Sequence, residues 1–232
     1  MTVSDVIFAN EIPVGSAEPH GIIYKIRQNV TNNNILNYVQ PTTNYHCNGN
    51  IETIVKWDAQ WQGGNSQDTY LLIDFKDRFI FPTHYSMKGY SGYCFAKEWI
   101  LYGLNSTNGS PVEITRNTSV GSTFCGDPSI CSAAASTCTG CCCNDDWGTF
   151  IINSPTGAFR YLKMMSLLSS HSTSNWYMAM RGFEVFGILS KDGRTSLTKT
   201  PNPRKTICFK SCPMNSHLPV YIFLRLFSVF IS

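Results

Sequence analysis

Cysteines and aromatic residues carry most of the chemistry that this sequence offers. Six of the ten cysteines fall in one stretch: Cys125, Cys131, Cys138, Cys141, Cys142 and Cys143. Thiolates bind zinc tetrahedrally, and Cys138 with Cys141 has the spacing of one zinc knuckle. A second knuckle is missing, because Cys208 and Cys212 have three residues between them. We favour a cysteine-rich loop, or a disulfide staple in an exported protein, over zinc, and predict no metal and no cofactor.

Two tryptophans and an acid suggest a different chemistry. Trp57, Asp58 and Trp61 could form a platform for a sugar, because an aromatic ring covers a sugar face and a carboxylate binds its hydroxyls. Burial in the core is the structural alternative, and it is the commoner fate of tryptophan.

Motifs of catalysis are missing from the sequence. There is no Gly-x-Ser-x-Gly, no phosphate loop and no His-Glu-x-x-His. Cys94 and His84 could be combined into a hydrolase pair, but Tyr93-Cys94-Phe95 has no recognisable nucleophile setting. The adjacent acids Asp145 and Asp146 fit a solvated turn. We therefore predict that the chain is not an enzyme.

Short apolar segments must position these residues. In Thr69–Gly89, Leu71, Ile73 and Phe75 alternate with polar or outward positions, which is typical of a strand. Similar segments follow at Phe159–Ser166 and Tyr177–Ile188, with turn signals between them. Many short strands and a charged content of only 14% predict an all-β sandwich or barrel.

The charge is distributed unevenly. Residues 191–232 hold seven basic residues and one acid, so residues 1–190 hold 11 basic and 14 acidic residues. A mildly acidic domain gives no electrostatic footprint for nucleic acid. Met1–Gly15 lacks the pattern of a signal peptide, which predicts a cytoplasmic protein with mostly reduced cysteines. Four sequons, at Asn29, Asn105, Asn108 and Asn117, favour the extracellular alternative.

The end of the chain differs in composition from the rest. Leu218–Ile231 is apolar but is interrupted by Pro219 and Arg225, and its 14 residues fall short of the roughly 20 that span a bilayer as a helix. We predict a poorly ordered tail without membrane contact. The predicted organisation is a lead-in over residues 1–20, a β-sandwich over 21–189, and a basic linker with an apolar tail over 190–232.

An ordered series of motifs resembles a known family. The series is GIIYKI, VKWDAQW, IDFKDR, FPTHYSMKGY, KEWILYGLN, AFRYLKM and FEVFG. It is similar to the discoidin family, also called the coagulation factor 5/8 type C domain, over Gly21–Leu189. The resemblance implies a jelly-roll β-sandwich of the galactose-binding-like group. The cysteine-rich insertion, the tail and the absence of cysteines at the domain ends depart from the family, and the missing staple favours a reducing compartment.

The resemblance also implies structural roles. Trp99 is expected between the sheets, and Asn105 at the start of the following turn. Arg160 is expected to bond loop carbonyls or to pair with an acid. From the residues themselves, Asp74 is expected to be half-buried and bonded to backbone, and His84 to be a hydrogen-bonded strand residue.

Family members bind through loops at one end of the sandwich, which gives the candidate binding residues. They are Tyr45, His46 and Asn48 in a first loop and Tyr90, Tyr93 and Phe95 in a second. The structural alternative is that these residues cap the open end of the core. We predict a non-catalytic module that recognises carbohydrate or a protein surface. The alternative is an intracellular protein-interaction or scaffold module without glycan binding.

Overall fold

The computed structural model describes residues 6–10, 18–30, 34–64, 66, 68–89, 98–118, 147–153, 155–167 and 178–193. These residues belong to one compact unit, Met1–Leu197. The predicted linker and tail beyond residue 193, and the cysteine-rich insertion at Ser122–Asp146, lie outside the described residues.

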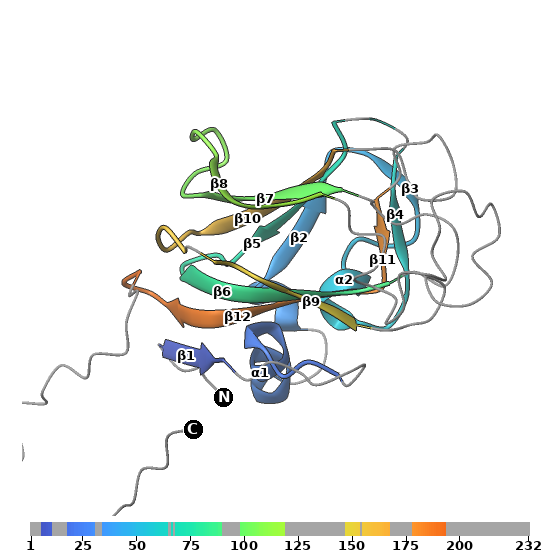
Figure 1. Cartoon of the computed structure of the whole chain (residues 1–232). Helices are drawn as coiled ribbons and strands as arrows, with labels where there is room; N and C mark the ends of the chain where they lie inside the picture. Colours follow the sequence, from blue (N-terminus) through green and yellow to red (C-terminus); the bar gives the residue numbers. More distant parts are fainter. Residues whose placement is uncertain are drawn as a thin grey trace, which may run out of the picture. The chain divides into compact units, whose positions relative to one another are not determined.

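Two antiparallel sheets form the body of this unit (Figure 1). The first sheet has the strand order β1 (Val6–Ala9), β12 (Gly182–Ser190), β6 (Phe79–Lys88) and β9 (Trp147–Ile151). The second has the order β2 (Gln40–Thr43), β5 (Tyr70–Asp74), β10 (Tyr161–Ser166), β7 (Trp99–Leu104) and β8 (Val112–Asn117).

Side chains of the two sheets meet in a common aromatic core. The Trp99 indole of β7 donates a hydrogen bond to the Tyr85 hydroxyl of β6 over 2.8 Å, and both side chains are buried. Phe150 of β9 packs edge-on against Trp99 with ring centroids 5.0 Å apart. On β5, Leu71 and Ile73 point into this core and alternate with half-buried residues. The predictions of an all-β sandwich and of Trp99 between its sheets are confirmed.

A third, small sheet and three short helices complete the described part. The small sheet has the order β11 (Ala179–Met180), β4 (Trp61–Gly63) and β3 (His46–Asn48). The helices are α1 (Ile22–Asn29), the 3₁₀ helix η1 (Asn34–Asn37) and α2 (Thr53–Lys56). In Figure 1 the small sheet stands at one end of the sandwich, beside α2. No helix among the described residues has the length and apolar character needed to cross a membrane.

The predicted lead-in contains a strand of the first sheet. Val6–Ala9 pairs antiparallel with β12 from Val6 opposite Ser190 to Ala9 opposite Gly187. Its inward residues Ile7 and Ala9 are buried in the core, whereas Phe8 is 44% exposed. The apolar segment that follows Gly21 is helical.

A buried carboxylate joins α1 to the centre of the first sheet. Glu184 of β12 is fully buried, and its carboxylate oxygens accept hydrogen bonds of 2.8 Å from the backbone amides of Ile23, Tyr24 and Val185. The first amides of a helix have no partner within the helix, and Gly21 supplies no side-chain cap. Glu184 therefore caps α1 from a position more than 160 residues away in sequence.

We expect the ionisation of Glu184 to make folding depend on pH. Burial raises the pKa of this carboxyl from 4.5 to about 8, although the backbone donors oppose the rise. Because the folded state then binds more protons than the unfolded state between these values, the free energy of unfolding should fall as the pH rises from about 4.5 to about 8. The fall should be on the order of a few kcal/mol.

Urea denaturation of the wild type and of Glu184→Gln across this pH range measures the effect. The glutamine variant is less stable at low pH, because its amide nitrogen meets a backbone N–H, but it lacks the carboxyl titration. The difference between the two proteins should therefore shrink as the pH rises, since other titrating groups are common to both. Parallel pH profiles would contradict the assignment.

Candidate functional site

Three of the predicted binding residues lie together on the outer edge of the small sheet. Tyr45 immediately precedes β3 and is 50% exposed, and His46 and Asn48 lie on β3 with exposed side chains. We call these three residues the β3 rim. Within the described part of the chain, β3 pairs only with β4, so its other edge faces away from the sheet. The rim therefore presents a phenol, an imidazole and an amide at one edge.

Hydrogen bonds hold the backbone of the rim in place. The Thr43 hydroxyl donates to the carbonyl of Tyr45 over 2.9 Å, and Gly64 N–H donates to the same carbonyl over 3.2 Å. The Asn44 amide donates to the carbonyl of Asp68, and its oxygen accepts from the backbone of Tyr70, over 2.8 and 3.0 Å. Asn44 thus ties the segment before β3 to the start of β5. Sequence reasoning missed this residue, although asparagine in a polar loop is a recurrent backbone partner.

Close backbone contact brings the end of β3 to the segment that carries Asp58. Gly49 has a φ of 75°, and a Cβ atom added there would lie 2.1 Å from the carbonyl oxygen of Gln60. Only glycine allows this approach. Asp58 is exposed and lies two residues before Gln60 in the sequence.

The predicted tryptophan platform does not form as a pair of open rings. Trp61 on β4 is fully buried and offers no face to a ligand. Trp57 is half-buried, and its indole donates to the carbonyl of Phe183 over 3.1 Å. The Arg27 guanidinium lies over its ring at 4.4 Å, and Trp147 packs edge-on at 4.9 Å. Trp57 therefore joins α1, α2 and β12, while burial in the core, the alternative raised from the sequence, holds for Trp61.

A row of three aromatic rings, missed from the sequence, lies beside the start of α1. The exposed His20 ring stacks on Tyr24 with centroids 4.2 Å apart, and Tyr24 lies 6.2 Å from Trp57 in a near-parallel orientation. His20 precedes α1, so helical periodicity gave no signal for this contact.

The second predicted loop lies outside the described residues, together with its candidates Tyr90, Tyr93 and Phe95. The same holds for Cys94, which the hypothetical pair with His84 requires, and for the six clustered cysteines. Among the described residues, no group of His, Cys, Asp and Glu side chains could hold a metal ion. Cys47 is a free thiol, exposed on β3.

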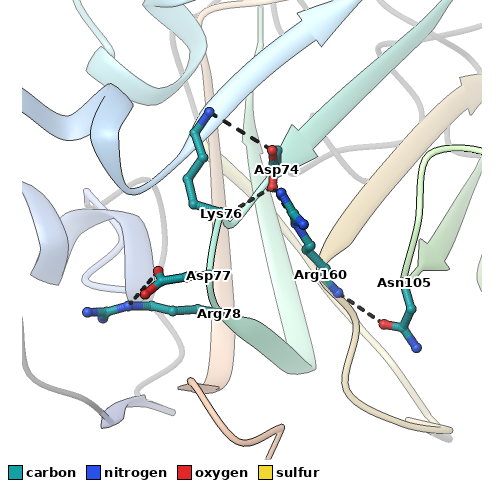
Figure 2. Close-up of polar contacts among 6 residues, drawn as sticks. All are labelled: Asp74, Lys76, Asp77, Arg78, Asn105 and Arg160. Carbon is teal, nitrogen blue, oxygen red and sulfur yellow. Dashed lines mark hydrogen bonds and ion pairs between the residues drawn. The ribbon is translucent and has the colours of Figure 1, made fainter.

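A charged cluster elsewhere on the sandwich is satisfied by its own members (Figure 2). Asp74 accepts from the Lys76 backbone over 2.7 Å and from the Arg160 guanidinium over 3.2 Å. The Asn105 side chain accepts from the backbone of Arg160 over 3.2 Å. The predictions that Asp74 bonds to backbone and that Arg160 pairs with an acid are confirmed. Asp74 and Arg160 thus bind each other and neighbouring backbone groups, which is a structural role.

His84 lies in β6, away from the β3 rim. Its Nδ1 is 3.0 Å from the Thr83 hydroxyl, and burial lowers the pKa of the imidazole. The prediction of a hydrogen-bonded strand residue is confirmed.

The chain is similar to several solved carbohydrate-binding modules. The family 32 carbohydrate-binding module of Clostridium perfringens NanJ, solved with galactose, shows 9% identity and a TM-score of 0.45 over 65% of this chain and 94% of that one. A module from a Clostridium perfringens family 31 glycoside hydrolase shows 11% identity and a TM-score of 0.47, over 65% of this chain and 92% of that one. The chitosan-binding module 2 from Paenibacillus sp. IK-5, solved with chitotriose, shows 10% identity and a TM-score of 0.44, over 65% of this chain and 97% of that one. With TM-scores below one half, these likenesses do not identify the family of this chain.

No family model matches the sequence, and no curated protein matches it.

We expect the turn after β3 to require glycine. In Gly49→Ala, the positive φ and the contact with the Gln60 carbonyl should lower the free energy of unfolding by about 2 kcal/mol. Gly157→Ala is the matched control, because a Cβ there meets only Phe159 at an ordinary 3.8 Å. Urea denaturation of both variants measures the effect. Equal stabilities would show that the turn is not constrained as described.

Proposed function

We propose that this chain is a non-catalytic binding module that recognises carbohydrate through the β3 rim. The observation that carries the proposal is the state of Tyr45, which is half exposed although its backbone is held by Thr43 and Gly64. A ring presented in a fixed position covers the apolar face of a sugar at little entropic cost. The resemblance of the sequence to the discoidin family supports the same end of the sandwich as the binding surface.

The polar members of the site suit sugar hydroxyls. His46 supplies a ring nitrogen as donor or acceptor, and the Asn48 amide supplies both kinds of group. Asp58, on the neighbouring segment, adds a carboxylate acceptor. Such a set fits a neutral sugar better than an anionic one, because the acid would repel a second negative charge.

Recognition of a protein surface is the second candidate, and the position of β3 favours it specifically. Among the described strands, β3 is the last of its sheet, so an extended peptide could add to it by backbone hydrogen bonds. Competition separates the two candidates, because a free sugar should displace a glycan but not a peptide strand.

The test compares glycan binding by two variants that each remove one exposed aromatic ring, Tyr45→Ala and Phe8→Ala. We expect Tyr45→Ala to weaken glycan binding about tenfold, through the loss of roughly 1.4 kcal/mol of ring contact. The melting temperature should stay unchanged, because the ring is half exposed. Binding is measured on a glycan array and then by calorimetry with the full chain, using galactose and chitotriose as first probes.

Phe8→Ala is the matched control, because Phe8 is similarly exposed, at 44%, but lies at the edge of the first sheet. It should bind as the wild type does. Binding that survives Tyr45→Ala would reject the rim as the site, and unfolding of that variant would assign Tyr45 to the core. A folded wild type that binds no glycan would leave the protein-surface candidate.

A further inference from the structure

Two Asn–Gly steps occur in the described part of the chain, at Asn48–Gly49 and at Asn108–Gly109. In such a step the backbone nitrogen of glycine can attack the side-chain amide carbon of asparagine, because glycine has no Cβ to hinder it. Both asparagines are exposed, so sequence and exposure alone do not distinguish them. Their glycine nitrogens, however, have different partners.

Of the two glycines, only Gly49 donates its N–H to the side chain of its own asparagine in the described part of the chain. Gly49 N–H donates to the Oδ1 atom of Asn48 over 2.8 Å, which places the nitrogen next to the amide group that it would attack. The Asn48 side chain makes no other hydrogen bond to the described residues and can turn its carbonyl toward that nitrogen. Gly109 N–H instead donates to the backbone carbonyl of Ser106 over 3.1 Å, within a turn. That bond engages the Gly109 N–H with a backbone carbonyl instead of the side chain of its own asparagine.

We propose that Asn48 is a site of spontaneous deamidation in the folded protein, whereas Asn108 is protected by its turn. The Gly49 nitrogen loses its proton to water and bonds to Cγ of Asn48. The Cγ–Nδ2 bond then breaks, and the side-chain nitrogen takes up a proton from water and leaves as ammonia. The resulting succinimide is hydrolysed by one water molecule at either carbonyl. The products are aspartate or isoaspartate at position 48, and no oxidant or cofactor takes part.

The modification changes the β3 rim in two ways. Either product adds a negative charge to the β3 rim. Isoaspartate also lengthens the backbone by one atom where β3 pairs with β4, at the register shift between His46 and Asn48. The chemistry at Asn48 does not depend on what the rim binds, so this inference stands apart from the proposed function.

Peptide mapping of the aged protein tests the proposal. The full chain is incubated at physiological temperature and mildly alkaline pH, and both Asn–Gly peptides are followed by mass spectrometry with fragmentation that separates aspartate from isoaspartate. We expect Asn48 to convert several-fold faster than Asn108. In denaturant both glycine nitrogens are released, so the two rates should become similar.

Two variants complete the test. Asn48→Gln keeps an amide at the edge but requires a larger ring, so the new charge should not form there, whereas Asn108→Gln should leave the reaction at Asn48 unchanged. Equal rates at the two sites in the folded chain, or faster conversion at Asn108, would overturn the proposal. A rate ratio that persists in denaturant would overturn it as well, because the difference would then not come from the fold.

Discussion

The buried carboxyl group of Glu184 makes the contact on which the helical side of the sandwich depends. It accepts hydrogen bonds from both the start of α1 and the backbone of β12, so one side chain fixes a helix to the central strand. The approach is so close that a Cβ at Gly21 would lie 2.5 Å from both the Glu184 carboxyl carbon and the Val185 carbonyl. One residue earlier on the same strand, the carbonyl of Phe183 binds the Trp57 indole. Two adjacent positions of β12 therefore anchor α1 and the end of α2.

This anchoring leaves the candidate site on a framework that need not move when a ligand arrives. The small sheet joins the first sheet through β11, which precedes β12 by one residue. Trp61 of its middle strand β4 is buried, and of its three strands only β3 is exposed along its whole length. Binding at such an edge uses groups that are already outside the core, so its cost is limited to the ordering of a few side chains.

The sequence predicted the parts of the fold that depend on local pattern and missed those that depend on distant partners. The alternation in β5 could be inferred from periodicity, and the resemblance offered an acid as one possible partner of Arg160. That this acid is Asp74 came only from the structure. Glu184 gave no such signal, since an acid within an apolar strand is interpretable only once α1 is packed against it. Likewise, the sequence spacing of Trp57 and Trp61 does not show which of the two side chains the rest of the fold buries. The core enclosed Trp61, and the contacts of Trp57 come from helices and strands far away in sequence.

The contrast between the β3 rim and the charged cluster shows why exposure alone does not define a site. Asp74 and Arg160 are polar and accessible, but each has its partner within the chain, so a ligand would have to break those bonds before making its own. At the rim, hydrogen bonds hold the backbone of Tyr45, while its ring and the exposed His46 side chain remain available. A fixed backbone with uncommitted side chains is what binding at low entropic cost requires. The same arrangement leaves the Asn48 amide open to attack by its own neighbour, so the features that favour recognition at this edge also favour its slow chemical change.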